Sequence, residues 1–270
     1  VSAGMLTIVT GHPSSGKSEL VDQIMVNLAK SNGWQFAVSS FENEPRIHIA
    51  KLISKYMGKP FFMGPTARME PEELEIGKEF IRKHFSFIYQ ADGMMASMDS
   101  ILERLKAAVM RYGIRGVVID PYNYIQKPHD VTETDWISVM LTRVRLFAQA
   151  HGLHVWFVAH PAKMMRSADG KVPAPKGYDI SGSAAWFAKA DHGLTVHRPD
   201  PAKSVASEVH SWKSRFSWLG KQGQCTLYFN TTTSTYSELS NTAWSVPEGV
   251  DDPFADIGSD QTDDGETNDF

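Results

Sequence analysis

Cysteine and long apolar runs are the features that this 270-residue chain has least of. Cys225 is its single cysteine, which excludes a disulfide within the chain and leaves no set of thiols to hold a zinc ion. This cysteine usage favours an intracellular, reducing setting. No apolar run approaches the about 18 residues that a membrane-spanning helix needs, and the segment after Val1 lacks the charged-then-apolar pattern of a signal peptide. We therefore expect a cytoplasmic location and no membrane partner.

Basic residues are absent from the last part of the chain. Residues 249–270 contain eight of the 31 acidic residues and neither Lys nor Arg, so the 27 basic residues face 23 acidic ones in residues 1–248. The formal charge of −4 therefore divides into a body of about +4 and a tail of −8. We expect residues 1–246 to form one globular domain and residues 247–270 a disordered acidic tail. A basic body keeps nucleic acid open as a partner.

Hydrophobic patterning predicts an α/β fold. The expected strands are Met5–Thr10, Trp34–Phe41, Phe85–Tyr89, Gly116–Asp120, His154–His160, Gly193–His197, Glu208–Lys213, Cys225–Phe229 and Thr235–Leu239. The expected helices are Lys17–Ser31, Arg46–Met57, Pro71–His84, Met98–Arg111, Thr132–Ala150 and Ser183–Ala190. Early strands are almost continuously apolar, as buried parallel strands are, and the later ones alternate. The patterning thus indicates a mainly parallel central sheet flanked by helices, with antiparallel strands added toward the C-terminus.

A glycine-containing turn follows the first expected strand and opens the first expected helix. Its sequence, GHPSSGKS over residues 11–18, fits the phosphate-loop (Walker A) pattern G-x-x-x-x-G-K-[ST] at every fixed position. Backbone N–H groups and the helix N-terminus in such a turn hold phosphates, the lysine adds positive charge, and the final hydroxyl binds Mg²⁺. A turn before an ordinary helix is the alternative, but this context favours nucleotide binding. The expected nucleotide contacts are Gly11, Ser14, Ser15, Gly16, Lys17 and Ser18.

Two acidic side chains are expected at the ends of strands beside this loop. Asp120 ends an apolar strand and would join Ser18 in the Mg²⁺ shell, although an aspartate there can also cap the turn before Pro121. Hydrolysis further needs a group that orients or deprotonates water. Glu42, directly after the second expected strand, is the favoured general base; Glu44 is its competitor, and a solvated acid is the alternative for either.

Six segments in a fixed order carry a resemblance to a known family. They are GHPSSGKS, SSFENEP, GVVIDPYNYIQ, HVWFVAHPAK, DISGSAAWFAKADHGLTVHR and WKSRF, within about residues 4–240. The set resembles the RecA-like motor domain of the DnaB-like hexameric replicative helicases, in the branch that holds phage primase-helicases and the mitochondrial helicase Twinkle. The resemblance implies a RecA-like P-loop NTPase fold and an NTP-hydrolysing, ATP-dependent DNA helicase. It also implies ATP, dTTP or another NTP with Mg²⁺ as cofactors, and self-assembly into a hexameric or heptameric ring.

The resemblance assigns roles to further residues. His160 corresponds to the family's γ-phosphate sensor, although a histidine at a strand end often only hydrogen-bonds to backbone. Lys213 and Arg215 correspond to the lysine and arginine finger that act on the neighbouring subunit's nucleotide, where the planar fork of an arginine neutralises charge on phosphate oxygens. A solvated strand face is the alternative there. Arg198 and Phe229 match positions that sandwich the base.

A basic loop and the acidic tail match family segments that bind partners. The loop, residues 161–178, matches the central DNA-binding loop, and its charges would follow the phosphates of single-stranded DNA without reading sequence. Its cations are Lys163, Arg166, Lys171 and Lys176. The tail ending in Phe270 resembles the phage helicases' tail that contacts DNA polymerase, which suggests a phage-infected host cell. A solvated loop and a purely solubilising tail are the alternatives.

Two other functions remain open from the sequence. One is a RecA-type DNA-dependent ATPase, a recombination or regulatory filament that does not unwind duplex. The other is a nucleotide-dependent clamp or loader that does not translocate. Neither a polymerisation motif nor a homologous-pairing loop is recognisable, and the strand WKSRF at 212–216 favours the helicase.

Overall fold

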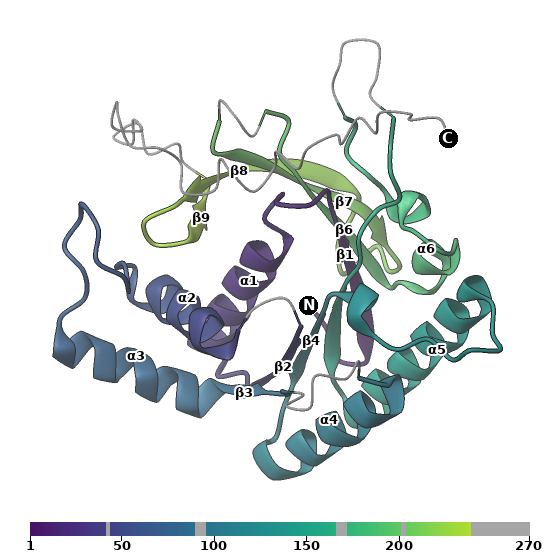
Figure 1. Ribbon diagram of the computed structural model, residues 1–270, viewed down its shortest axis with the longest axis horizontal. Coiled ribbons are helices and arrows are strands. Elements are labelled where there is room, and N and C mark those ends of the chain that lie inside the picture. Colours follow the sequence, from purple (N-terminus) through teal and green to yellow (C-terminus); the bar gives the residue numbers. More distant parts are fainter. Residues whose placement is uncertain (42–43, 90–95, 166–171, 201–203, 239–270) are drawn as a thin grey trace, which may run out of the picture. The chain divides into compact units, whose positions relative to one another are not determined.

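The strands of this protein form one sheet covered by helices on both sides (Figure 1). The computed structural model describes residues 1–41, 44–89, 96–165, 172–200 and 204–238. The strands within these residues are β1 Met5–Thr10, β2 Phe36–Ser40, β3 Phe85–Phe87, β4 Gly116–Asp120, β5 His154–Val158, β6 His192–His197, β7 Ala206–Ser214, β8 Gly223–Asn230 and β9 Thr235–Ser237. The helices are α1 Lys17–Asn32, α2 Pro45–Met57, α3 Pro71–His84, α4 Met98–Tyr112, α5 Glu133–His151 and α6 Ala185–Lys189.

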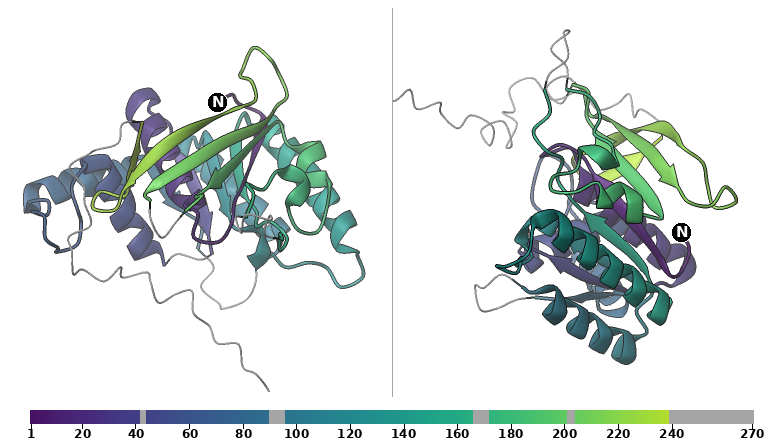
Figure 2. Two further views of the ribbon diagram at one scale, coloured as in Figure 1. Left: turned by 90° about the horizontal axis from the view of Figure 1, so that it is seen from above. Right: turned by 90° about the vertical axis from the view of Figure 1, so that its right-hand side faces the viewer.

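The sheet combines a parallel part with an antiparallel extension. Its order over the described residues is β3-β2-β4-β5-β1-β6-β7-β8-β9. The neighbours from β3 to β6 are parallel, whereas β6, β7, β8 and β9 pair antiparallel. Figure 2 shows the green strands that extend the sheet beyond its parallel part. The predicted fold class is therefore confirmed.

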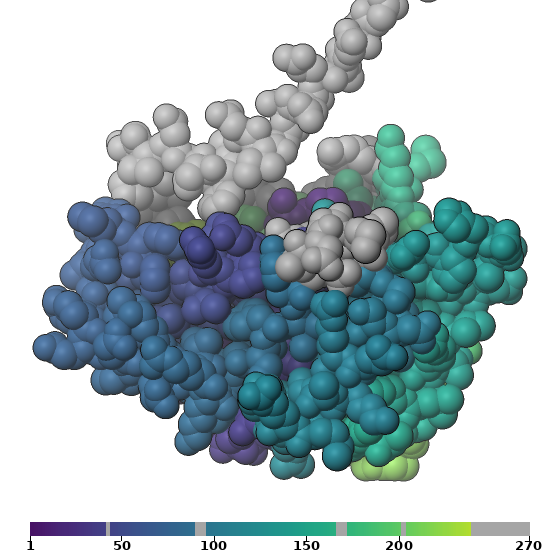
Figure 3. All heavy atoms as spheres, turned by 60° about the horizontal axis from the view of Figure 1, so that its bottom comes forward, coloured from purple at the N-terminus to yellow at the C-terminus, as the bar shows by residue number. Residues whose placement is uncertain are grey.

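Alternation along the central strands divides the core into two layers. Val117 and Ile119 of β4 join the cluster that packs against α4, α5 and α6. Val118, between them, joins the cluster that packs against α1, α2 and α3. Because both faces are covered, the central strands are apolar at nearly every position. The blue to teal atoms of α3, α4 and α5 form much of the surface that faces the viewer in Figure 3.

Strand ends differ from the predicted ones by about two residues. β2 begins at Phe36 rather than Trp34, and β3 ends at Phe87 rather than Tyr89. The register explains the shorter β3, because Val38 of β2 pairs with Phe87 as the last pair of these two strands. The apolar pattern of this segment continues past the last pair, to Tyr89, so patterning alone overestimates the length of β3.

The domain boundary and the tail extend beyond the described residues. One compact unit spans Val1–Leu239. The predicted tail, residues 247–270, lies outside the described residues, and the boundary at residue 246 stays a prediction. In the part of the chain that the structure describes, every helix is too short or too polar to cross a bilayer.

Removing the buried indole of Trp156 should destabilise the fold strongly. This side chain is 1% exposed and its ring lies 6.4 Å from Trp34 and 6.1 Å from Phe36. Trp156→Ala leaves a cavity, and we expect it to lower the free energy of unfolding by about 3–5 kcal/mol. Trp218→Ala is the matched control, because Trp218 is 77% exposed. Urea unfolding measures both, and similar shifts in the two variants would contradict the assigned core.

Candidate active site

The loop between β1 and α1 has the backbone conformation of a phosphate-binding turn. Gly11, Ser14 and Gly16 have φ of 152°, 58° and 91°. The space around the glycines is closed as well, because a Cβ at Gly11 would lie 2.2 Å from the Val196 carbonyl oxygen, and one at Gly16 would lie 2.2 Å from the Tyr236 hydroxyl. Side chains are therefore excluded at both positions, which keeps the loop's backbone accessible to a ligand. Ser15, within the loop, is buried.

Lys17 directs its charge at the loop that precedes it. The side chain is largely buried, and Nζ donates hydrogen bonds to the carbonyl oxygens of Gly11 at 3.0 Å and His12 at 2.9 Å. An ammonium group held this way lies where phosphate oxygens would enter the loop. The first residue of α1 thus positions positive charge beside the helix N-terminus, and both features favour an anion.

The two predicted Mg²⁺ ligands meet at the end of the parallel strands. The Ser18 hydroxyl donates to Asp120 Oδ2 at 2.5 Å, although 102 positions separate the two residues. Hydroxyl and carboxylate oxygens suit Mg²⁺, which completes its coordination with waters and substrate phosphates. The residues present therefore fit Mg²⁺. The described residues contain no group of three or more His, Cys, Asp or Glu side chains that could hold a metal ion.

His160 lies at the same sheet edge, between the Asp120 strand and the phosphate loop. It follows β5, which pairs with β4 on one side and β1 on the other. The Ala159 N–H donates to the Val9 carbonyl at 3.0 Å, and the His160 carbonyl accepts from the Ser181 N–H at 3.3 Å. This backbone position is compatible with contact to a γ-phosphate; the sensor role stays a prediction.

The candidate general bases follow β2. Glu42 lies outside the described residues, so its role stays a prediction. The preceding Phe41 donates its N–H to the Asp120 carbonyl at 2.9 Å, which keeps the end of β2 beside Asp120. The competitor Glu44 lies directly before α2, with 60% of its side chain exposed and 3.8 Å from Arg46.

Aromatic residues of β8 and β9 lie beside the phosphate loop. The rings of Phe229 and Tyr236 are 5.0 Å apart, and the Tyr236 hydroxyl donates to the Gly16 carbonyl at 3.3 Å. Burial raises the pKa of Tyr236 to about 12, so its hydroxyl keeps the proton that it donates. Sequence reasoning missed Tyr236, because the residue belongs to no motif and lies 220 positions from Gly16.

Arg198 directly follows β6, at the end of that strand near the loop. One of its terminal nitrogens donates to the Ser204 carbonyl at 3.2 Å. The charge of Arg198 also acts on the pKa of Tyr236, which indicates that the two side chains lie near each other. The sandwich of a base between Arg198 and Phe229 is untested and stays a prediction.

Lys213 and Arg215 lie at the opposite end of the strands from the phosphate loop. Asp191, 1% exposed, accepts from the Leu6 N–H through Oδ2 at 3.1 Å and pairs through Oδ1 with Arg215 at 3.2 Å. Leu6 is near the start of β1, whereas the loop begins five positions later, about 16 Å further along the strand at 3.3 Å per residue. The two cations therefore lie far from this chain's own phosphate site.

Both predicted finger residues are held by contacts within the chain. Besides Arg215, Asp191 pairs with Arg145 at 3.1 Å. Lys213 Nζ donates to the carbonyl oxygens of Phe187 at 2.5 Å and Ala188 at 3.2 Å. Burial, and then the neighbouring charge of Arg215, lower the pKa of Lys213 below its ordinary value. These contacts fix where the cations lie; their action on a second chain stays a prediction.

The basic loop begins directly after His160. A bridge between Pro161 and Ile180 closes its base, and Lys163 and Lys176 are exposed on it. The predicted DNA contacts Arg166 and Lys171 lie outside the described residues. DNA binding by all four cations therefore stays a prediction.

The fold and the phosphate loop are those of a P-loop NTPase domain. The model of the AAA domain family matches residues 1–165, more than half of the chain, so the chain belongs to that family. A similar protein is the Twinkle homolog protein, chloroplastic/mitochondrial, of Arabidopsis thaliana, which is 44% identical over 249 residues. That alignment covers 88% of this chain and 34% of the relative, so the chain spans about a third of the relative's length.

Solved structures give the same fold. One ATPase domain matches with a TM-score of 0.74 and 17% identity, covering 89% of this chain and 86% of that one. A DnaB-like replicative helicase, studied with its interactions with primase, matches with a TM-score of 0.73 and 17% identity, covering 88% of this chain and 60% of that one. The resemblance to the RecA-like domain of DnaB-like helicases is confirmed. The predicted location in a phage-infected host cell stays a prediction. The name of the Arabidopsis thaliana relative refers to chloroplasts and mitochondria.

Replacing Asp120 should affect nucleotide binding only when Mg²⁺ is present. Asp120→Asn removes the carboxylate charge beside Ser18, and we expect the tightening of nucleotide affinity by Mg²⁺ to fall by roughly 10–100-fold. Affinity in EDTA should stay within about twofold of wild type. Titration with a fluorescent nucleotide measures both, and the exposed Asp130 provides the control variant Asp130→Asn. Equal losses with and without Mg²⁺ would contradict the assigned metal role.

Proposed function

We propose that this chain is the NTP-hydrolysing motor domain of a replicative DNA helicase, which couples hydrolysis at subunit interfaces to translocation on single-stranded DNA and duplex unwinding. The observation that carries the proposal is the division of the candidate residues between two ends of the strands. Ser18 and Asp120 meet at one end, 2.5 Å apart. Arg215 is paired with Asp191 at the other. One chain therefore offers parts of two different sites.

The phosphate end supplies binding and orientation. Lys17 and the loop N–H groups hold the β- and γ-phosphates, while Ser18 and Asp120 hold the Mg²⁺ that neutralises charge on them. Glu42 orients or deprotonates the attacking water. ATP, dTTP or another NTP with Mg²⁺ is the substrate, since the contacts described for the loop select phosphates rather than a base.

The opposite end supplies charge to a neighbour. In a ring of six or seven copies, Lys213 and Arg215 face the nucleotide of the next subunit, and the guanidinium stabilises negative charge that develops during transfer. A finger supplied in trans makes hydrolysis depend on assembly. The likeness to a DnaB-like replicative helicase supports the ring arrangement.

DNA binding is assigned to the loop that follows His160. Its charges, on Lys163, Arg166, Lys171 and Lys176, follow phosphates without sequence preference, as a translocating motor needs. His160 connects that loop to the γ-phosphate. The acidic tail is proposed to contact a DNA polymerase. The basis for this is its negative charge and its resemblance to the phage helicases' tail.

Mixing two inactive variants should restore hydrolysis. Lys17→Ala removes the phosphate side of a shared site, and Arg215→Lys keeps the charge beside Asp191 but loses the planar fork. Each variant alone should lose about 10³-fold in DNA-stimulated hydrolysis, the lower end of what an arginine finger contributes. Mixed rings contain interfaces in which an intact loop meets an intact finger, so part of the activity should return.

The exposed Arg82 gives the control variant, Arg82→Lys, which should keep full activity. Phosphate release on single-stranded DNA and unwinding of a forked duplex are the measurements. Full hydrolysis by Arg215→Lys would contradict the proposed action of Arg215 on the nucleotide of the neighbouring subunit. DNA-stimulated hydrolysis without unwinding by the wild type would favour the filament ATPase instead.

A further inference from the structure

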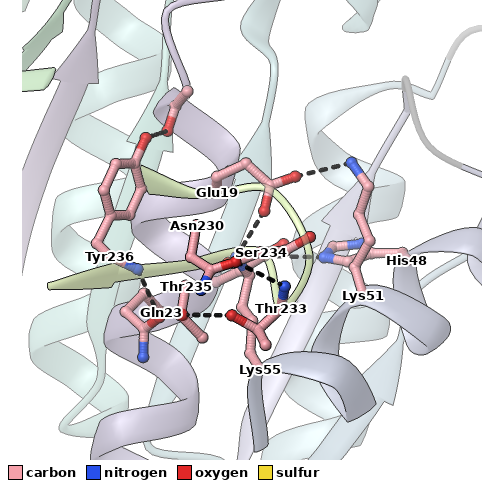
Figure 4. A network of polar contacts seen from close by, with 12 residues as sticks. Glu19, Gln23, His48, Lys51, Lys55, Asn230, Thr233, Ser234, Thr235 and Tyr236 are labelled. Atoms are coloured by element: carbon pink, nitrogen blue, oxygen red, sulfur yellow. Dashed lines mark hydrogen bonds and ion pairs between the residues drawn. The ribbon is translucent and has the colours of Figure 1, made fainter. Parts of the chain in front are cut away.

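A buried lysine connects three elements around the candidate nucleotide site (Figure 4). Lys55 belongs to α2, and its side chain has no exposed surface. Its Nζ pairs with Glu19 Oε2 at 2.6 Å and donates to the Ser234 carbonyl in the turn between β8 and β9. The same Nζ lies 5.7 Å from the centre of the Phe229 ring. One ammonium group thus contacts both α1 and the β8–β9 hairpin.

The first of these contacts reaches the phosphate side. Glu19 directly follows Ser18 in the first turn of α1, so its position is tied to that of the phosphate loop. The Glu19 carboxylate pairs with Lys55 through Oε2 at 2.6 Å and with Lys51 through Oε1 at 2.8 Å, so it holds Lys55 against α1.

The second contact reaches the hairpin that carries Phe229 and Tyr236. The turn is tightly defined, because Ser234 has a φ of 54°, in the left-handed region. Gln23 of α1 accepts a hydrogen bond from the Tyr236 N–H at 3.3 Å, and the Tyr236 hydroxyl donates to Gly16 at 3.3 Å. Lys55 and Gln23 together fix the distance between this hairpin and α1.

Burying a lysine is unfavourable unless its charge is paired, and an apolar side chain can fill the same volume at less cost. Packing alone therefore does not explain a lysine at this junction. A charge that bonds a carboxylate on one element and a backbone carbonyl on another sets a geometry that an apolar contact would leave loose. That geometry is the separation between the phosphate loop and Phe229.

We propose that Lys55 is a positioning residue that sets the base-binding side of the nucleotide site relative to its phosphate-binding side. The inference rests on the proposed function and on the predicted role of Phe229, which it takes to face the base of a bound NTP. Lys55 does not touch the phosphates in this arrangement. Its loss should weaken recognition of the nucleoside and leave recognition of the phosphate chain intact.

Lys51 provides a matched control one helical turn away on α2. Its Nζ pairs with the other oxygen of the same carboxylate, Glu19 Oε1, at 2.8 Å, and its side chain is 33% exposed. Within the described residues its hydrogen bond and ion pair go to Glu19, whereas the hydrogen bond to the hairpin belongs to Lys55. Lys51→Met and Lys55→Met therefore remove the same kind of ion pair, but only the second releases the hairpin.

The experiment compares ATP with inorganic tripolyphosphate, by calorimetry on the full chain with Mg²⁺. For Lys55→Met we expect ATP affinity to fall about tenfold, equivalent to about 1.4 kcal/mol, while tripolyphosphate affinity stays within about twofold. KM for ATP should rise with kcat nearly unchanged. Lys51→Met should alter neither affinity, and Lys55→Arg should recover part of the ATP affinity.

A second variant covers the case in which Lys55→Met does not fold, as judged by thermal unfolding. Gln23→Ala releases the Tyr236 N–H without disturbing a buried charge, and it should lower ATP affinity selectively, by a smaller factor. Equal loss of ATP and tripolyphosphate affinity in a folded variant, or no loss of either, would overturn the proposal. Failure of the wild type to bind ATP would instead remove the proposed function.

Discussion

Parallel strand pairing is the constraint on which the rest of this structure depends. The carboxyl ends of parallel strands lie at one edge of a sheet, so the residues that follow β1, β2, β4 and β5 are brought together however far apart they are in sequence. Ser18 and Asp120 meet there, and His160 follows the strand between theirs. The helix that opens after β1 adds its N-terminus to the same edge, which makes that edge suitable for an anion.

The antiparallel extension places Lys213 and Arg215 at the opposite edge of the sheet from the phosphate loop. β7 runs back along β6, so the residues at its end return to where β1 and β6 begin. Asp191 fixes that arrangement by accepting from the Leu6 backbone while pairing with Arg145 and Arg215. Its carboxylate is buried but compensated by two guanidinium groups, the condition under which a buried charge is tolerated. Within one chain, Arg215 and the phosphate loop therefore lie at opposite edges of the sheet.

The contact between the β8–β9 hairpin and the phosphate loop has a different physical basis. β8 and β9 belong to the antiparallel part, and they reach the phosphate loop through individual side chains rather than through the sheet. Tyr236 contacts Gly16, Gln23 holds the Tyr236 backbone, and Lys55 holds the turn. The buried pair of His48 and Asp22, 2.8 Å apart, also joins α2 to α1. Burial alone would lower the pKa of His48, but the Asp22 carboxylate outweighs it and raises that pKa, which favours the charged pair.

The fold class, nearly every strand and helix, and the phosphate loop could be predicted from the sequence, because periodicity and the spacing of Gly11, Gly16, Lys17 and Ser18 are local. It also singled out Asp120, since an acid at the end of an apolar strand is a local signal. Strand ends were less predictable, because β3 pairs with β2 only as far as Val38, although β2 itself continues to Ser40. Three contacts could not be predicted in this way: Tyr236 with the loop, Asp191 with Arg215, and Lys55 with both α1 and the hairpin. Those contacts depend on which strands become neighbours in the sheet, and a local sequence pattern does not contain that information.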